Sequence, residues 1–86
     1  MKADKKEVTR LLKTARGQMD GILKMIDDDR YCIDISNQLL ATIAILKKAN
    51  KEIISSHMKH CVLDASDEDA SIKIDETIQI INQMMT

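Results

Sequence analysis

The sequence predicts an all-α protein, and three observations support this class. The 86 residues include no proline and only two glycines, so little in the chain would break a helix. The apolar residues are mainly Ile, Leu, Met and Ala, and they recur every three or four residues, as on one face of a helix. No stretch alternates apolar and polar residues for long enough to form a β-hairpin. We therefore expect one helical domain over residues 1–86.

The first helix is expected from about Lys5 to Met25. Its apolar residues follow each other at alternating steps of four and three, a heptad-like seam that consists of Val8, Leu12, Ala15, Met19, Ile22 and Ile26. Gly17 costs about 1 kcal/mol relative to alanine inside a helix, which indicates close packing against another backbone at that point. The helix should end in the aspartates at 27–29, because acidic residues disfavour a helix C-terminus and favour the start of the next helix.

The second helix is expected from about Tyr31 to Cys61, which is long for a globular protein. It carries two neighbouring apolar stripes, so it needs two partners, of which one is the first helix. The most economical second partner is the same helix of another subunit. The first stripe consists of Leu39, Ile43, Leu46, Asn50, Ile53 and His57, and the second of Leu40, Ala44, Ile54, Met58 and Cys61.

After a polar break at residues 64–69, the last helix is expected from about Glu68 to Met85. Its apolar face would consist of Ile74, Ile78, Ile81 and Met85. A chain of this length buries a modest core and often needs an oligomer or a metal for stability. The predicted architecture is therefore a three-helix protomer whose long antiparallel helices form a homodimer.

Two cysteines and one histidine form the most informative pattern in the chain. His57 and Cys61 lie one helical turn apart and project from the same face. Together with Cys32 they offer one imidazole and two thiolates, a soft donor set suited to Cu(I) or Zn(II). Structural zinc prefers four ligands, so three favour Cu(I). Along one helix, however, Cys32 would lie about 37 to 44 Å from the other two and could not join them within one chain.

An antiparallel pair of second helices would bring the three ligands together. Cys32 of one chain would then meet His57 and Cys61 of the other, and the two-fold axis would pass near residues 45 and 46. This stretch is apolar, as such a pairing requires. Each dimer would hold two metal sites.

The distribution of charge indicates a second kind of binding. The net charge is −1, but residues 2–24 and 30–60 are mainly basic and residues 61–86 are mainly acidic. A basic face is the usual footprint of nucleic-acid binding, although solvated charged faces are also common. Tyr31 is the only aromatic residue, which favours the backbone of a duplex over stacking on single strands. The candidate DNA-binding residues are Lys6, Arg10, Lys13, Arg16, Lys47, Lys48 and Lys51.

Several classes of protein are not expected. The chain shows no signal-peptide pattern and no long apolar run, which predicts a soluble cytoplasmic protein with reduced thiols and no membrane partner. No nucleophile–base pair, phosphate-binding loop or paired carboxylates can be recognised, so we expect neither an enzyme nor a small organic substrate.

Three sequence motifs resemble a known family. They are "GQ" at 17–18, "RYC" at 30–32 and "HMKHCV" at 57–62, and with the three-helix layout they resemble the copper-sensitive operon repressor (CsoR/RcnR-type) family of bacterial regulators. The resemblance covers essentially the whole chain. It implies an all-helical dimer that assembles into a homotetramer, binds double-stranded operator DNA and leaves it when an effector binds.

The resemblance also implies roles for individual residues. Cys32, His57 and Cys61 fall on the ligand positions of the copper-sensing branch. Tyr31 and, with a one-residue gap in the loop, Glu76 fall on positions that support the ligands by hydrogen bonding. The first helix departs from the family pattern, since Leu11 and Thr14 stand where arginine is common and Arg16 stands where glutamate is usual.

The function expected from these observations is that of a Cu(I)-responsive transcriptional repressor, bound to operator DNA when metal-free and released by Cu(I). The branches that sense nickel or cobalt, formaldehyde and sulfide fit less well, because Ala3, Cys61, Lys2 and His57 depart from their patterns. Two alternatives stay open. A thiol-based sensor of reactive sulfur or oxidants would use the same two cysteines. A cytosolic copper buffer or chaperone would use the same three ligands.

Overall fold

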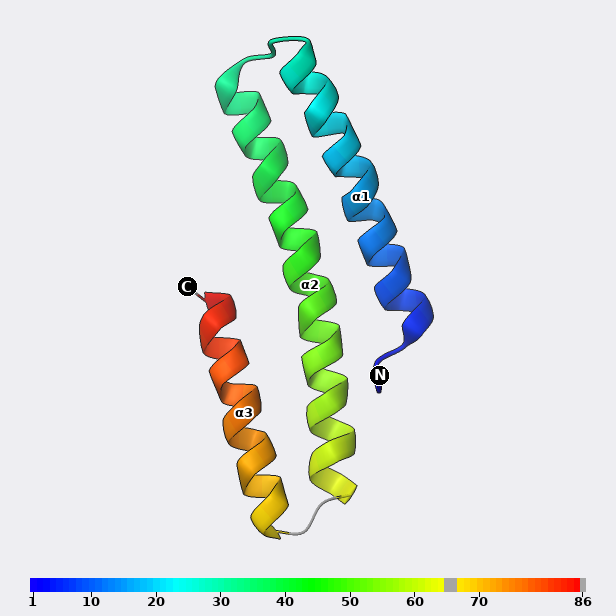
Figure 1. The fold of residues 1–86 in the computed structure, drawn as a ribbon, viewed down its shortest axis with the longest axis vertical. Helices are drawn as coiled ribbons and strands as arrows, with labels where there is room; N and C mark the ends of the chain where they lie inside the picture. The colour runs from blue at the N-terminus through cyan, green and yellow to red at the C-terminus, as the bar shows by residue number, and fades with distance from the viewer. Residues whose placement is uncertain (65–66, 86) are drawn as a thin grey trace.

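Three helices account for nearly all of the residues that the structure describes, so the all-α prediction is confirmed. The computed structural model describes the backbone of residues 1–64 and 67–85 and the side chains of residues 1–60 and 71–84. Helix α1 spans Lys5–Asp27, α2 spans Cys32–Asp64 and α3 spans Asp67–Met85. Successive helices run antiparallel, and α1 and α3 lie on opposite sides of α2 (Figure 1).

The three helices form a layer that is one helix thick. The Cα extents are 55 × 27 × 12 Å. Helix α2 contacts both of its neighbours, whereas no contact between α1 and α3 is recorded for the described residues. A single layer cannot enclose a core on both of its faces, and many large apolar side chains consequently remain exposed in the protomer. The fold therefore leaves apolar surface that a partner has to cover.

Helix α1 begins at a well-formed cap. The carboxylate of Asp4 accepts hydrogen bonds from the backbone N–H groups of Lys6 and Glu7, at 3.0 and 3.4 Å. These two N–H groups would otherwise lack a partner at the start of the helix. The cap places the first basic residues of the chain on a regular helix from Lys5 onward.

The predicted seam of α1 proves to cover two different faces. Val8, Ala15 and Ile22 are buried, as expected, but the buried residue in the second turn is Leu11 rather than Leu12. Three other members of the seam, Leu12, Met19 and Ile26, are 46 to 54% exposed. One face of α1 therefore packs on α2, and a neighbouring apolar face has no partner within the protomer.

Helix α2 meets α1 through small residues that hydrophobic periodicity does not mark. Thr42 and Ala49 are 4% and 2% exposed. The Thr42 hydroxyl donates its proton to Oε1 of Gln18 on α1 (2.9 Å) or to the carbonyl oxygen of Gln38 (3.1 Å). Because a hydroxyl has one proton, the two acceptors share it. This side chain links α1 to α2 at mid-length.

Helix α3 packs on the opposite side of α2, and its buried residue was not predicted. Thr77 is 2% exposed, and its hydroxyl donates to the carbonyl oxygen of Lys73 at 2.8 Å. A pocket of about 240 Å³ between the two helices is lined by Lys51, Ile54, Ser55, Ile81 and Met84. Of the predicted apolar face, Ile78 is 46% exposed, and Met85 lies outside the described side chains. The contact face is thus rotated from the predicted one.

The turn between α1 and α2 is a Schellman motif with an unusual residue in it. The backbone N–H of Asp29 donates to the carbonyl of Ile26, and that of Arg30 donates to the carbonyl of Met25. Asp29 has φ 51°, in the left-handed region where glycine is the usual residue. The predicted break at residues 27–29 is confirmed, since α1 ends at Asp27 and α2 begins at Cys32.

Replacing Asp29 by glycine should stabilise the protein. Asp29→Gly relieves the left-handed strain and is expected to raise the free energy of unfolding by about 0.5 to 1 kcal/mol. Asp28→Gly is the matched control, because it removes the same charge at a residue with φ −86°. Thermal unfolding of both variants at equal protomer concentration measures the effect. A melting temperature that rises equally in both would assign the gain to charge and contradict this account.

Candidate metal centre and nucleic-acid interface

Cys32 is the first residue of α2 and is exposed. The helix is already regular there, because the carbonyl of Tyr31 accepts the N–H of Ile35 at 3.2 Å. Cys32 is therefore accessible to a ligand at the start of α2.

His57 lies on the same unbroken helix, 25 residues after Cys32. At about 100° per residue, the two positions differ by only about 20° around the helix axis, while they are separated by about 37 Å along it. The backbone of Cys61 follows one turn after His57 on α2, and its side chain lies outside the described residues. The ligand positions thus share one face of α2 but lie near opposite ends of it. No cluster of three potential metal-binding side chains occurs among the described residues of the protomer.

The face that carries the predicted ligands can be matched with a second copy of itself. Six of its positions form three pairs whose residue numbers sum to 89, and Ile53 of the same face falls opposite Ser36. Leu39, Ile43 and Leu46 are 46, 44 and 42% exposed. If two copies of α2 run antiparallel with Cys32 opposite His57, Leu39 falls opposite Asn50 and Ile43 opposite Leu46. This is the arrangement that an antiparallel pair around a two-fold axis requires.

The exposed apolar surface extends from α2 onto α1. Met19, Ile22 and Leu23 of α1 line a pocket of about 210 Å³ together with Leu39 of α2. Leu23 is 62% exposed and Met19 54%. Both helices therefore contribute to the apolar surface beside the ligand positions.

The two predicted supporting residues lie at different ends of α2. Tyr31 immediately precedes α2 and is 68% exposed. Glu76 is exposed on α3, next to the buried Thr77. Since Ile81 and Met84 of α3 lie beside residues 51–55 of α2 and the helices are antiparallel, Glu76 lies level with the part of α2 that holds His57. Within one protomer, Tyr31 is near Cys32 and Glu76 is near His57.

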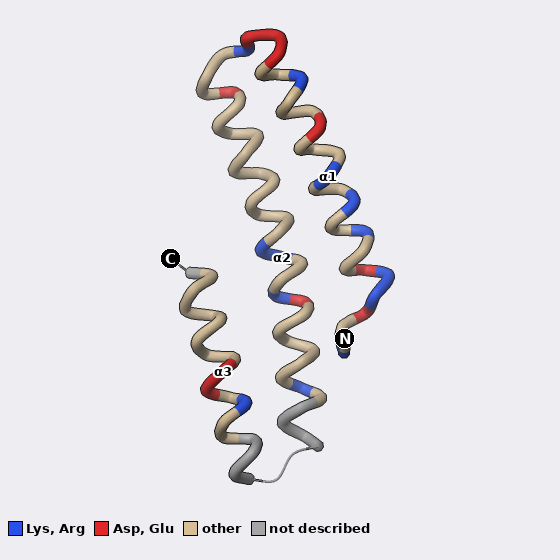
Figure 2. Tube along the Cα trace, in the orientation of Figure 1, with Lys and Arg blue, Asp and Glu red and all other residues tan. Residues whose placement is uncertain are grey.

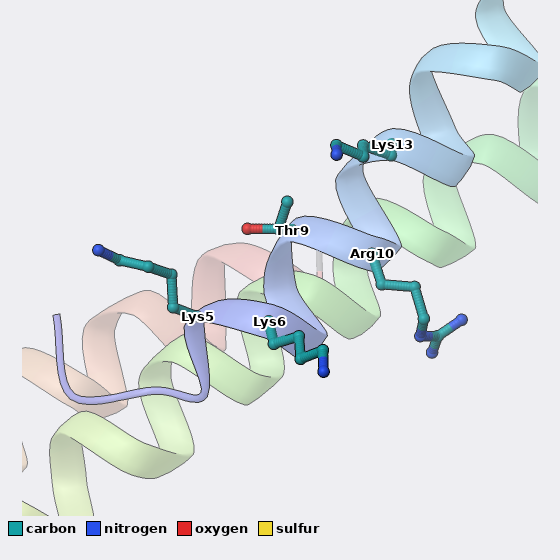
Figure 3. Close-up of a pocket in the computed structure, with 5 residues that line it drawn as sticks. All are labelled: Lys5, Lys6, Thr9, Arg10 and Lys13. Atoms are coloured by element: carbon teal, nitrogen blue, oxygen red, sulfur yellow. The ribbon is translucent and has the colours of Figure 1, made fainter.

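The basic residues of α1 are exposed, and Figure 2 shows them as blue segments that recur along the helix. A shallow depression there is lined by Lys5, Lys6, Thr9, Arg10 and Lys13. In Figure 3 the side chains of Lys5 and Lys13 extend to one side of the helix and those of Lys6 and Arg10 to the other. Arg16 is also exposed.

Gly17 has no atom within 4 Å of the place where a Cβ would lie, so the predicted close packing at Gly17 is absent from the protomer.

Arg10 differs from its basic neighbours because it is paired with an acid. Its Nε and Nη2 donate to the two carboxylate oxygens of Glu7, at 3.0 and 2.6 Å. The hydrogen bond from Arg10 lowers the pKa of Glu7, which desolvation opposes, and the positive charges of Arg10 and Lys48 lower the pKa further. The same pair raises the pKa of Arg10. Glu7 is therefore ionised at neutral pH and holds the guanidinium.

The three lysines of α2 are divided between its sides. Lys48 is close enough to Glu7 on α1 to act on its pKa, whereas Lys51 lines the pocket against α3. Lys47 is exposed. Within one protomer, α1 and Lys48 therefore form one basic region, and Lys51 belongs to the other side of α2.

The structure also explains two unusual residues of α1. Leu11 is 4% exposed and packs toward α2, so this position cannot contact DNA. The hydroxyl of Thr14 donates to the carbonyl of Arg10 at 3.0 Å.

The residues that sequence reasoning missed are Glu7 and the Gln18–Thr42 pair. An acid three residues before an arginine on a helix is a recognisable signal, whereas nothing in the sequence connects Gln18 with Thr42.

Comparisons with known proteins identify the family of the chain. Residues 4–83 match the family model described as metal-sensitive transcriptional repressor. The copper-sensing transcriptional repressor CsoR of Mycobacterium ulcerans (strain Agy99) is 40% identical over 74 residues, 81% of this chain and 61% of the relative. CsoR of Bacillus subtilis (strain 168) is 40% identical over 62 residues, 72% of this chain and 61% of the relative. The chain thus spans about three fifths of the length of these relatives.

A solved structure shares the fold over the full chain. It is the crystal structure of the copper-sensing repressor CsoR with Cu(I) from Geobacillus thermodenitrificans NG80-2, with a TM-score of 0.79 and 32% identity, covering 100% of this chain and 94% of that one. Fold, motifs and matches agree that the chain belongs to the family of metal-sensitive transcriptional repressors.

Among the described residues, no helix is long and apolar enough to span a membrane.

The hydroxyl of Thr42 should contribute measurably to the contact between α1 and α2. Thr42→Val keeps the shape but leaves the amide of Gln18 without this partner, so the free energy of unfolding should fall by about 1 kcal/mol. Thr9→Val is the matched control at an exposed site on α1, where a change below about 0.5 kcal/mol is expected. Chemical denaturation at fixed protomer concentration measures both. Equal losses in the two variants would show that the Gln18 contact has no special weight.

Proposed function

We propose that the protein is a Cu(I)-responsive transcriptional repressor that binds operator DNA in its metal-free form and releases it when Cu(I) binds. The observation that carries the proposal is the shared face of α2, on which Cys32 and His57 lie about 20° apart around the helix axis and Cys61 follows one turn later. Support comes from membership of the repressor family and from relatives named as copper-sensing.

The donor set fits Cu(I). Two thiolates and one imidazole are soft ligands, and three of them suit a metal that accepts low coordination. Bound Cu(I) would supply a soft centre that holds the three side chains together. Cys32 of one subunit would join His57 and Cys61 of the partner subunit, because the length of α2 separates these residues within one chain. The homodimer is therefore part of the proposal, as is the assembly of two dimers into a tetramer.

The proposed route from the metal to DNA uses contacts within the protomer. Ligands at both ends of α2 fix the position of one α2 helix against the other. Helix α1 follows α2 through its buried face and through the Thr42–Gln18 hydrogen bond, so the basic residues of α1 move with it. Tyr31 of one subunit would support His57 of the other by hydrogen bonding across the dimer, and Glu76 would support His57 within its own subunit. By linkage, DNA weakens copper binding by the same factor that copper weakens DNA binding.

The DNA surface proposed here consists of exposed basic residues. They are Lys6, Arg10, Lys13 and Arg16 of α1 with Lys47, Lys48 and Lys51 of α2. Such residues bind phosphates without reading the sequence of the bases directly. Within the cell the protein would act in the cytoplasm, where thiols stay reduced.

One alternative has an observation in its favour. Cys32 is exposed and would be accessible to reactive sulfur species or oxidants, as a thiol-based sensor requires. Such a sensor uses the two cysteines but not His57. A copper buffer, by contrast, would use all three ligands and bind no DNA.

Titration of Cu(I) into a protein–operator complex tests the proposal. Fluorescence anisotropy of labelled DNA from the protein's own promoter should fall to the free value as the sites fill. His57→Ala should weaken this response by at least about tenfold in Cu(I), while His60→Ala, the adjacent exposed histidine, should behave as the wild type. DNA that stays bound at saturation excludes the copper-released repressor. A full response of His57→Ala to polysulfide alone would favour the sulfur sensor.

Mixed dimers test whether the metal site lies between subunits. Cys32→Ala and Cys61→Ala homodimers should each lack complete sites. A heterodimer of the two variants keeps one complete site, since its intact Cys32 and its intact His57 and Cys61 come from different chains. We expect about one tightly held Cu(I) per heterodimer and none per homodimer in competition with a Cu(I) chelator. No recovery in the heterodimer would place the site within one chain.

A further inference from the structure

We propose that Glu7 competes with DNA phosphates for Arg10 and thereby limits the affinity of the basic surface of α1 for duplex DNA. This inference rests on the proposed function, because it concerns the DNA-binding surface of the same protein. It assigns to an acidic residue a role in setting how tightly that surface binds.

The geometry of the pair resembles that of a guanidinium bound to phosphate. Arg10 donates through Nε and Nη2 to both oxygens of Glu7, at 3.0 and 2.6 Å. Arginine recognises carboxylates and phosphates through this same two-point arrangement. A phosphate that approaches this edge of Arg10 must therefore displace Glu7. A phosphate that binds the remaining N–H groups instead comes close to the carboxylate and is repelled by it.

The pair is held ready in the free protein. Glu7 and Arg10 are three residues apart on α1, so the regular helix brings their side chains together. The start of that helix is fixed by the Asp4 cap, which accepts the N–H of Glu7 itself. The pair is accessible to a ligand, with the Arg10 side chain 58% exposed and that of Glu7 37%.

Arg10 is singled out among the basic residues of α1. Within α1, which the structure describes in full, the ion pair between Arg10 and Glu7 is the one recorded. Lys6 and Lys13 lie on the same helix without an acidic partner in that part of the chain. Lys48 adds positive charge on the Glu7 side, so the carboxylate lies within a basic region rather than at its margin. Removing its charge should therefore strengthen phosphate binding where Arg10 lies.

A double-mutant cycle separates competition for Arg10 from a general change of charge. The four proteins are wild type, Glu7→Gln, Arg10→Gln and the double variant, each measured on operator and on an unrelated duplex at about 0.1 M salt. Glu7→Gln should bind both duplexes more tightly than the wild type. The expected gain in affinity is about two- to fivefold for each copy of Arg10 in the oligomer that contacts a phosphate, which matches the usual strength of an exposed ion pair. In the Arg10→Gln background the same change should have only the small effect of a removed charge, within about twofold.

Asp20→Asn is the matched control. Asp20 is an exposed acid on α1 that is not part of the ion pair, and its replacement changes the net charge by the same amount. We expect its DNA affinity to stay within about twofold of the wild type. Measuring the helical content by circular dichroism checks that the variants fold. If Glu7→Gln does not fold, Glu7→Ala replaces it in the cycle.

The outcomes are distinguishable from failure of the proposed function. Unchanged or weaker DNA binding by Glu7→Gln overturns the inference, and so does an equal gain in the Arg10→Gln background. If the wild type binds operator and is released by Cu(I) while the cycle shows no coupling, only the inference about Glu7 fails. If the wild type binds neither duplex, the proposed function and this inference fail together.

Discussion

The structure depends on one constraint: α2 has neighbours on two opposite sides and none on a third. Helices α1 and α3 pack against it within a layer one helix thick, so the face that carries Leu39, Ile43 and Leu46 cannot be covered by the same chain. The hydrophobic effect favours covering such a face with a second copy. Cys32 and His57 lie on this face, at its two ends. The proposed dimer and the proposed metal sites would thus use the same surface.

Sequence reasoning succeeded where the physical signal is local. Helix periodicity and the aspartates at 27–29 gave the three helices to within three residues at each end. It failed where packing depends on small or polar side chains. Thr42 and Thr77 are the two buried polar residues among those described, yet their hydroxyls carry no hydrophobic signal and are satisfied by contacts that form only in the folded chain. Leu12 was predicted in place of Leu11 because both continue a helical pattern.

The sequence also predicts some parts of the candidate site more readily than others. Residue type and spacing select Cys32, His57 and Cys61 as candidate ligands, because ligand chemistry depends on few side chains, and this ligand set stays a prediction. The basic surface was harder to predict, since composition shows where positive charge lies along the chain but not how it is shared among helices. Lys48 is close to Glu7 whereas Lys51 lines the contact with α3. The pairing of Arg10 with Glu7 shows that a basic residue can already have a partner before any ligand arrives.

The antiparallel pairing proposed for α2 has a consequence for cooperativity. In an antiparallel dimer the two ions would lie at opposite ends of the paired helices, about 37 Å apart. This distance is several times the Debye length in solution, about 8 to 10 Å, so direct electrostatic interaction between the two ions is negligible. Any dependence of the second binding event on the first must be transmitted mechanically. The transmitting element is α2 itself, a continuous helix that carries a ligand of one site near its start and ligands of the other near its end.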